Sequence, residues 1–238
     1  MPPKKFLTTV TRIDQFSDSV KHFVFTLPPG EQIDFIAGQF AMSTIPNPEN
    51  PAKPFKRAYS IASSPFEKDF IELAITWVQG GPGSTYFHKN LHVGSQFELM
   101  APYGSFAYPK NSTGPLAFVA TGTGITPMRS MYRQLLHDGY KDPLLLIHGV
   151  RFDNELYYED ELQALKKKYP NFNYVRTLSR PSDKWTGEAG YVQTKLEKYI
   201  PKDVTAIYVC GVGKMIEDVK TTMESLGHGK DKVHYEKW

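Results

Sequence analysis

The chain has 238 residues, of which 28 are basic and 25 acidic, so its formal net charge is only +3. This length fits one large domain or two of moderate size, and the balanced charge argues against nucleic acid binding by phosphate neutralisation. A single cysteine, Cys210, excludes an internal disulfide and a Cys-ligated iron–sulfur cluster within this sequence.

Hydropathy indicates no membrane segment. No apolar stretch of signal-peptide length follows the N-terminus, and no run of about 18 apolar residues occurs. We therefore expect no membrane span and a cytoplasmic location. His88 and His92 lack the His-Glu-x-x-His pattern, so we expect no metal site there.

The first hundred residues have the pattern of β-strands. Apolar or alternating runs at 21–27, 70–78 and 97–100 each end at a turn rich in Gly or Pro. Strands separated by such turns predict a closed antiparallel barrel. The segment Pro46 to Pro54 contains four prolines and is predicted to be a loop.

Strands and helices alternate from residue 111 onward. Such alternation predicts a parallel sheet with helices on both faces, and a domain boundary near residue 110. The expected strands are 116–120, 144–148, 173–178, 206–210 and 233–235, and the expected helices are 128–137, 156–168, 192–199 and 216–226.

A glycine-rich turn, Thr121 to Pro127, follows the first strand of this second half. Such a turn brings backbone N–H groups and a helix N-terminus together, which attracts phosphate oxygens. Pro127 suits the first helical position. The pattern Gly-x-Gly-x-x-Pro is only part of the dinucleotide fingerprint, and an ordinary strand-to-helix turn has the same features.

Two segments of the first half have similar potential. In the run from Arg57 to Ser60, a guanidinium that can clamp a pyrophosphate shares a strand face with Tyr59, whose ring can stack on a heterocycle. The run from Gly80 to Thr85 combines a flexible turn with hydroxyls at a helix start, and so forms a second possible anion nest. A surface Arg with a packed Tyr, and a capped helix, are the structural alternatives.

The end of the chain offers two more features. Cys210 and Gly211 follow a predicted parallel strand, whose carboxyl edge faces the ligand crevice in doubly wound folds. A lone Cys between apolar residues is more often a buried small side chain. The terminal Trp238 either packs into the molecule or frays.

Together and in this order, these motifs resemble the ferredoxin–NADP reductase superfamily over nearly the whole chain. The matching patterns are Arg-x-Tyr-Ser at 57–60, Gly-Gly-x-x-Ser at 80–84, Gly-x-Gly-x-x-Pro at 122–127, Cys-Gly at 210–211 and Glu-x-aromatic at the terminus. The resemblance implies a six-stranded antiparallel β-barrel that binds flavin (1–110), followed by a five-stranded doubly wound parallel sheet that binds the nicotinamide nucleotide (111–238).

The resemblance also implies roles for single residues. The flavin site would comprise Arg57, Ala58, Tyr59, Ser60, Gly83, Ser84, Thr85 and Trp238. The nucleotide site would comprise Thr121, Gly122, Thr123, Gly124, Pro127, Ser179, Arg180, Tyr191, Cys210 and Gly211. The catalytic residues would be Ser60, Cys210, Glu236 and Trp238.

The implied activity is FAD-dependent transfer of electrons between NADPH or NADH and a one-electron protein acceptor such as ferredoxin or flavodoxin. Hydride would pass between nicotinamide C4 and flavin N5. Only the resemblance to this family favours FAD over FMN, and no single residue distinguishes them. Ser179, Arg180 and Tyr191 resemble ligands of the NADP 2′-phosphate, whereas the segment from Trp185 to Val192 also resembles NADH-using oxygenase reductases.

Two alternative functions remain open. The chain could instead be the NADH-dependent reductase component of an oxygenase or another multi-subunit redox complex, which would co-purify with its partner. A non-enzymatic binding module is the more distant alternative, and a colourless purified protein would support it.

We predict that Trp238 covers one flavin face and must move before the nicotinamide arrives. Deletion of Trp238 should therefore tighten nucleotide binding, measured as the Kd of NADP⁺ by titration of the flavin spectrum. A truncated protein that binds no better than the intact chain would contradict this role.

Overall fold

A computed structural model of the chain describes residues 2–47, 49–108 and 112–237. The chain forms two compact units, one holding the residues up to Tyr108 together with Arg129–Gln134, and the other holding the remainder. The boundary was expected near residue 110, and residues 109–111 lie outside the described residues. No helix in the described part of the chain is long and apolar enough to cross a membrane.

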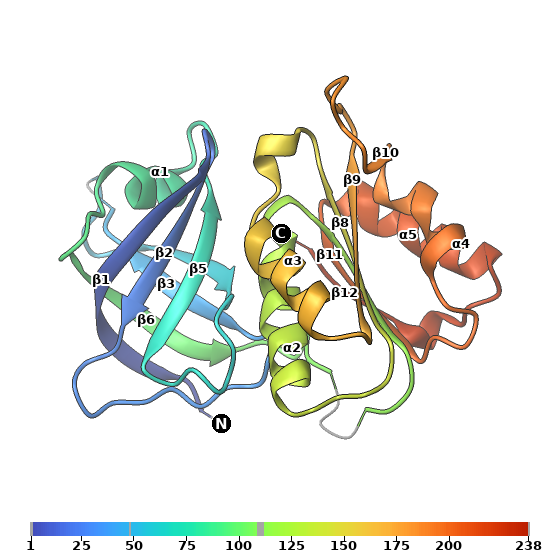
Figure 1. Cartoon of the computed structure of the whole chain (residues 1–238). Coiled ribbons are helices and arrows are strands. Elements are labelled where there is room, and N and C mark those ends of the chain that lie inside the picture. Colours follow the sequence, from blue (N-terminus) through green and yellow to red (C-terminus); the bar gives the residue numbers. More distant parts are fainter. Residues whose placement is uncertain (1, 48, 109–111, 238) are drawn as a thin grey trace. The chain divides into compact units, whose positions relative to one another are not determined.

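The first unit contains a single antiparallel sheet of six strands (Figure 1). Its order is β4-β3-β6-β1-β2-β5, and the number of strands and their antiparallel pairing confirm the prediction. The strands are β1 (Lys4–Ser17), β2 (Val20–Thr26), β3 (Phe40–Ile45), β4 (Phe55–Ser60), β5 (Phe70–Thr76) and β6 (Gln96–Tyr103).

The barrel is only partly closed. The edge strands β4 and β5 do not pair with each other along their length. They are joined just beyond the end of β4, where the N–H of Ala62 donates to the carbonyl of Glu72 at 2.8 Å. The sheet is therefore a half-barrel, open along β4, and this edge strand is the one that carries Arg57 and Tyr59.

Helix α1 (Pro82–Lys89) packs on the aromatic core of this unit through Phe87. The fully buried Phe87 ring lies 5.0 Å from that of Phe97 and 5.1 Å from that of Tyr59. Burial of one such ring stabilises a fold by roughly 1.5–3 kcal/mol. The helix is thus fixed beside β4 by an apolar contact, and its N-terminus is held near the Arg57 strand.

The second unit contains a parallel sheet of order β10-β9-β8-β7-β11-β12. All five predicted strands are present, and β10 adds a sixth that was not expected because two residues leave no periodic pattern. The strands are β7 (Leu116–Thr121), β8 (Leu144–Val150), β9 (Phe172–Leu178), β10 (Glu188–Ala189), β11 (Ala206–Gly211) and β12 (Val233–Lys237).

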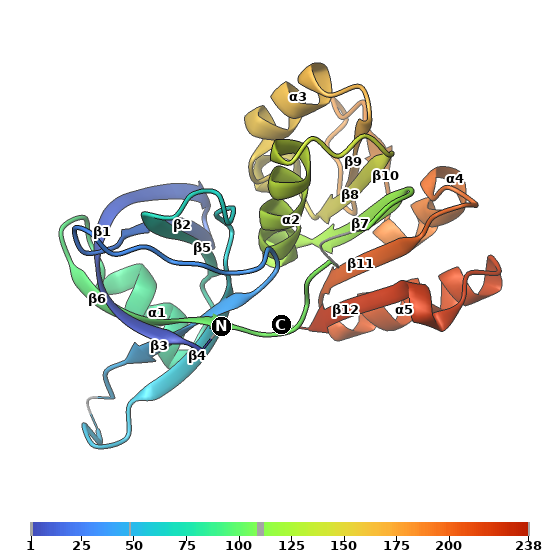
Figure 2. The same cartoon turned by 90° about the horizontal axis from the view of Figure 1, so that it is seen from below.

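The helices cover both faces of this parallel sheet, as predicted (Figure 2). They are α2 (Ile125–His137), α3 (Glu159–Lys168), α4 (Leu196–Tyr199) and α5 (Gly213–Ser225), with 3₁₀ turns η1 (Gly122–Gly124), η2 (Asp153–Glu155), η3 (Val192–Lys195) and η4 (Lys230–Lys232). Alternate strand residues such as Val119, Ile147 and Val209 form an apolar core with α4 and α5. Both faces of β7 and β8 are buried, which explains their continuous apolar sequence.

One buried ion pair lies within the first unit. The guanidinium of Arg129, 6% exposed, pairs with the carboxylate of Glu72, 5% exposed, and also donates to the carbonyl of Ala62 at 2.9 Å. His22 lies beside this pair, and burial lowers its pKa. The pair anchors Arg129 to the segment that directly follows β4.

Replacement of Arg129 by Met should lower the free energy of unfolding by about 3–5 kcal/mol, because Glu72 would keep a buried, uncompensated charge. Lys68→Met is the control, since Lys68 pairs with Asp34 at 2.6 Å on the surface and should cost under about 1 kcal/mol. Urea unfolding followed by circular dichroism measures both. Similar small losses in the two variants would contradict the analysis.

Candidate functional site

The edge strand β4 presents Arg57 and Tyr59 on the same face, as alternation predicts. The hydroxyl of Ser43 on β3 donates to the carbonyl of Arg57 at 2.8 Å and fixes the strand at this point. Tyr59 is half-buried against Phe87. Burial raises the pKa of Tyr59 to about 12, against the opposing effect of the Arg57 charge. The ring is therefore a neutral, well-held aromatic surface.

Arg57 lies against the first turn of α1. A Cβ atom added to Gly83 would come within 2.9 Å of the Arg57 side-chain Cγ and 3.4 Å of the Tyr59 hydroxyl. Gly83 is thus required because the stem of Arg57 crosses the backbone there. The guanidinium is exposed and donates to the carbonyl of Lys56 at 2.8 Å.

The N-terminus of α1 has no negative charge of its own. Pro82 occupies the first turn, which contains no acidic residue. The N-cap residue is Gly81, so no side chain caps the helix. The N–H groups of a first helical turn lack intrahelical acceptors and favour an anion. Together with Arg57, this turn can cradle a phosphate or pyrophosphate.

The other residues expected at this site have different surroundings. The buried Ser84 hydroxyl accepts from the N–H of Val78 at 3.0 Å, so this side chain holds the turn together. Ala58 is exposed, while Ser60 and Thr85 are half-buried at the end of β4 and in the first turn of α1. By the alternation of a strand, Ala58 and Ser60 lie on the opposite face of β4 from Arg57 and Tyr59.

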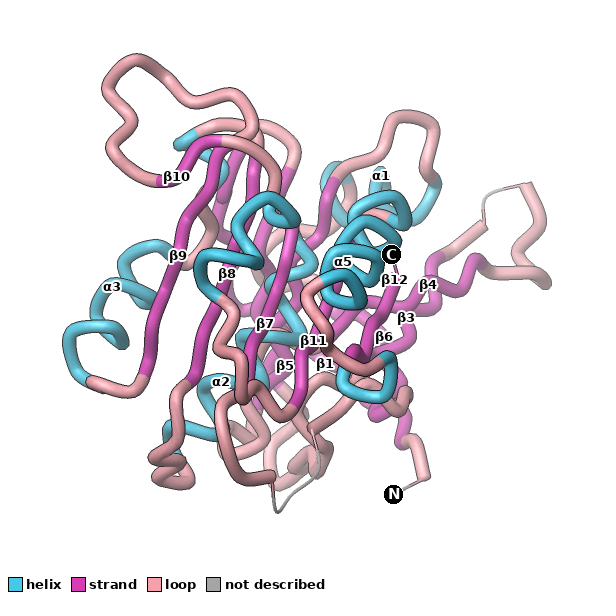
Figure 3. Tube along the Cα trace, turned by 90° about the vertical axis from the view of Figure 1, so that its right-hand side faces the viewer, coloured by secondary structure: helices cyan, strands magenta, loops and turns pink. Residues whose placement is uncertain are grey.

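In the second unit, the glycine-rich turn lies against the end of β11. Gly122 has a left-handed φ of +53°. A Cβ on Gly124 would overlap the carbonyl of Cys210, and one on Gly211 would overlap the Thr121 hydroxyl. The turn at Gly124 therefore packs directly on the backbone of Cys210, where β7 and β11 end side by side (Figure 3).

The turn leads directly into α2. The helix begins at Ile125, so Pro127 is its third residue and not its first, as the sequence suggested. Pro still fits, because N–H groups of the first turn have no acceptor in the helix. The hydroxyl of Thr126 donates to the carbonyl of Thr123 at 2.9 Å. The Thr121 hydroxyl is buried and has no partner among the described residues, which leaves one polar group for a ligand.

Cys210 and Glu236 are neighbours across β11 and β12, where they are register partners. Cys210 is 1% exposed, and both its burial and the Glu236 carboxylate raise the pKa of its thiol. The side chain is therefore a neutral thiol. Trp238, expected beside these residues, lies outside the described residues.

The residues expected around a 2′-phosphate follow β9. The N–H of Ser179 donates to the carbonyl of Val150 at 3.0 Å, and that of Arg180 to the carbonyl of Arg151 at 2.9 Å. Both arginines are exposed. Tyr191, 65% exposed, precedes η3. The two arginines thus lie on paired loops after β8 and β9.

Sequence reasoning missed Arg151 and His148. Arg151 directly follows β8, three positions after the end of the predicted strand 144–148, and its place near a carboxyl edge was a usable signal. His148 is fully buried in β8, and its Nε2 lies 3.1 Å from the carbonyl of Gly122. Burial lowers the pKa of His148 to about 4, so the ring is neutral. No pattern of the sequence pointed to this contact.

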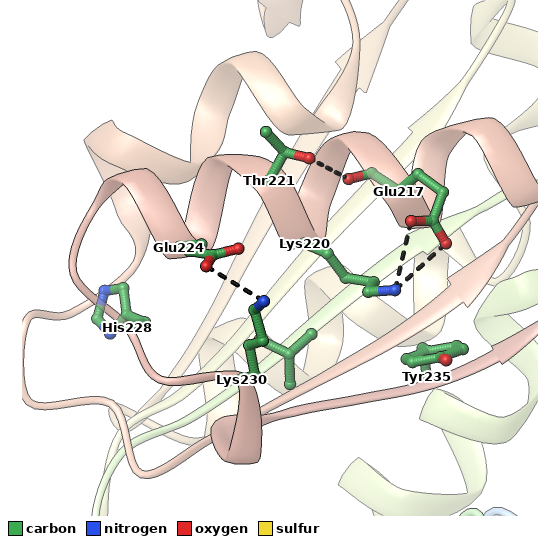
Figure 4. Close-up of a pocket in the computed structure, with 8 residues that line it drawn as sticks. Glu217, Lys220, Thr221, Glu224, His228, Lys230 and Tyr235 are labelled. Carbon is green, nitrogen blue, oxygen red and sulfur yellow. Dashed lines mark hydrogen bonds and ion pairs between the residues drawn. The ribbon is translucent and has the colours of Figure 1, made fainter.

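A groove of about 350 Å³ lies between α5, η4 and β12, away from the glycine-rich turn (Figure 4). Its charges are paired with each other. Lys220 contacts Glu217 and Lys230 contacts Glu224, each at 3.3 Å. No group of three His, Cys, Asp or Glu side chains among the described residues could hold a metal ion. We assign the groove no ligand.

The residues present fit the two groups that the fold implies. In the first unit, Gly83 leaves space for the Arg57 stem, beside a helix N-terminus without acidic residues. In the second unit, a glycine turn and an unpartnered Thr121 hydroxyl meet at the carboxyl edge of a parallel sheet. These features suit a flavin pyrophosphate and a dinucleotide respectively, and they define a flavin- and nucleotide-binding oxidoreductase.

Comparison with known families agrees with this class. Residues 7–108 match an oxidoreductase FAD-binding domain, and residues 118–221 match an oxidoreductase NAD-binding domain. Ferredoxin--NADP reductase B of Sorangium cellulosum is 34% identical over 98% of this chain and 97% of its own length. The phenol hydroxylase P5 protein of Acinetobacter pittii is also 34% identical, over 98% of this chain and 65% of its own.

Solved structures share the fold. A ferredoxin NADP⁺ reductase from Neisseria gonorrhoeae with bound FAD and NADP aligns with a TM-score of 0.82 at 23% identity, covering 100% of this chain and 99% of that one. The FAD/NAD-binding domain of nitric oxide dioxygenase from Vibrio cholerae aligns with a TM-score of 0.88 at 21% identity, covering 98% of each chain. The chain belongs to the ferredoxin–NADP reductase superfamily of FAD- and NAD(P)-binding oxidoreductases.

The raised pKa of Cys210 predicts that its thiol reacts slowly with alkylating reagents. At pH 8, iodoacetamide should label the native protein more slowly than the urea-unfolded protein, by a factor on the order of 100, because burial limits both thiolate formation and access. Mass spectrometry of the labelled peptide measures the two rates. Equal rates before and after unfolding would show that Cys210 is not held as described.

Proposed function

We propose that this chain is a FAD-dependent reductase that passes electrons between NADPH and a one-electron protein acceptor such as ferredoxin or flavodoxin. One observation carries the proposal: each unit provides a glycine-lined anion cradle, at the start of α1 beside Arg57 and at the turn before α2. When bound, FAD couples a two-electron donor to one-electron acceptors.

The proposed role of the residues in the first unit is to bind and orient the flavin. Arg57 and the backbone of Gly83, Ser84 and Thr85 bind the pyrophosphate. Tyr59 offers its neutral ring to one face of the isoalloxazine, supported from behind by Phe87. Ser60, at the end of β4, is proposed to hydrogen-bond near N5, and Ala58 leaves space on the other face of the strand.

The nucleotide-side residues orient the nicotinamide and exclude water. Thr121 to Gly124 and Pro127 bind the dinucleotide, and Gly211 leaves the space that this approach needs. Cys210, as a neutral thiol, lines the nicotinamide position without adding charge. Glu236, its partner across the strands, is proposed to balance charge or hold a proton, and Trp238 to cover the remaining flavin face.

NADPH is favoured over NADH by the two exposed arginines. Arg180 and Arg151 carry positive charge on adjacent loops at the carboxyl edge of the sheet, where an Arg accommodates a 2′-phosphate. Asp153 in this region accepts from the hydroxyl of Ser182 at 2.9 Å. The Glu155 carboxylate accepts from the N–H of Arg151 at 3.0 Å. The carboxylates of Asp153 and Glu155 thus have local hydrogen-bond donors, and the arginines, with Ser179 and Tyr191, are proposed to contact the phosphate.

The names of the relatives support a redox protein as the acceptor. One relative over nearly its full length is named a ferredoxin--NADP reductase. Others, such as the anthranilate 1,2-dioxygenase electron transfer component of Acinetobacter baylyi, are named as parts of oxygenase systems, and the chain spans 67% of that protein. An NADH-dependent reductase component of an oxygenase is therefore the second candidate.

A visible spectrum of the purified protein tests the proposal. A flavin spectrum that bleaches without oxygen on addition of NADPH, and more slowly with NADH, is the expected result. Bleaching by NADH alone together with a co-purified partner would favour the oxygenase reductase component. A colourless protein that binds no added FAD would contradict both.

Replacement of Arg57 by Ala should weaken FAD binding by about 10- to 100-fold, because a charge-assisted contact to the pyrophosphate is lost. The control is Lys56→Ala, which removes an exposed charge from the adjacent strand position and should change the Kd less than about threefold. Fluorescence titration of apoprotein with FAD gives both constants. Equal effects of the two variants would contradict the role of Arg57.

Arg180→Glu and Arg151→Glu should each lower kcat/KM for NADPH about 10- to 100-fold and change that for NADH far less. The control is Lys184→Glu, which makes the same charge change on an exposed residue of the same loop. Steady-state rates with ferricyanide as acceptor measure all three variants. If both nucleotides lose the same efficiency, neither arginine recognises the 2′-phosphate.

A further inference from the structure

His148 contacts the nucleotide turn from inside the sheet. It lies on β8, next to β7, and its side chain is completely buried. Its Nε2 is 3.1 Å from the carbonyl oxygen of Gly122, the residue with the left-handed backbone. That oxygen also accepts from the N–H of Ile125 at the start of α2.

This contact, together with the hydrogen bond from Ile125, restrains the direction of the next backbone donor. In a trans peptide the C=O and N–H vectors are antiparallel. When the Gly122 carbonyl is held toward His148, the N–H of Thr123 in the same peptide is directed away from the sheet interior. A carbonyl turned the other way would instead repel a phosphate. A donor at His148 thus supports the peptide orientation that suits an anion.

The ring is costly to keep at this position. Its Nδ1 is buried and has no hydrogen-bond partner among the described residues. An unsatisfied buried polar atom costs stability and needs an explanation. Because the ring is neutral and Nε2 faces a carbonyl, the proton lies on Nε2 and the Nδ1 lone pair stays unused. A leucine would fill the same space without this cost.

We propose that His148 is a positioning residue, which orients the Gly122–Thr123 peptide for the nucleotide phosphates through its Nε2–H donor. The inference rests on the proposed function, because it assigns a role to a residue behind the nucleotide site. His148 touches neither ligand and acts through the turn.

Three substitutions separate hydrogen bonding from packing. His148→Leu removes the donor and keeps an apolar filling. In His148→Gln, the side-chain amide nitrogen is separated from Cα by the same number of bonds as Nε2 of histidine, so it can place an N–H donor at a similar distance. In His148→Asn, the amide nitrogen is one bond closer to Cα. The flavin-loaded proteins are titrated with NADP⁺ and followed by the flavin difference spectrum and by calorimetry, and KM and kcat for NADPH are measured with ferricyanide.

The expected result is a Kd for NADP⁺ at least tenfold higher in His148→Leu and His148→Asn, and within threefold of the natural protein in His148→Gln. KM should rise with Kd, while kcat and the flavin content change less than twofold. If His148→Leu does not fold, the comparison of Gln with Asn decides. Unchanged Kd in folded Leu or Asn variants, or a Gln variant as weak as Leu or Asn, would overturn the proposal.

The natural protein is titrated first with NADP⁺ and NAD⁺. If it binds neither, the proposed function fails, and the role of His148 fails with it. If it binds NADP⁺ and the variants do not differ from it, only the role of His148 is overturned.

Discussion

The close approach of two backbones at the carboxyl edge of the parallel sheet is the constraint on which the nucleotide site depends. Gly124 on the turn and Gly211 at the end of β11 leave no space for a side chain. Glycine at both positions lets the turn and the end of β11 pack this closely, and the turn leads directly into the N-terminus of α2. The unpartnered Thr121 hydroxyl lies at the same edge.

The anion site of the first unit is built from different structural elements. There the anion cradle uses a helix that is held by the aromatic contact of Phe87, and a guanidinium from the edge strand β4. Because β4 pairs along only one side, its residues are accessible in a way that those of a closed barrel are not. The open edge is thus a requirement of the site. Tyr59 combines both requirements, because it packs against the core on one side and remains half-exposed.

Two buried polar side chains, one in each unit, each hold a backbone carbonyl. Arg129 donates to the carbonyl of Ala62 just beyond β4, and His148 to the carbonyl of Gly122. In each case a charged or polar side chain with little solvent contact restrains the peptide whose carbonyl it contacts. Such contacts have high energetic consequences because the surrounding dielectric is low.

Local signals in the sequence were sufficient for the alternation of elements, the glycine turn at 121–127 and the shared face of Arg57 and Tyr59, because periodicity and turn chemistry act over a few residues. The two-residue strand β10 and the open side of the barrel depend on pairing between distant segments, which leaves no local pattern. For Ser84 the sequence allowed a phosphate ligand, whereas the structure bonds its hydroxyl to Val78. The contact of His148 with Gly122 arose only from tertiary structure, because the two residues are 26 positions apart and meet where β7 and β8 lie side by side.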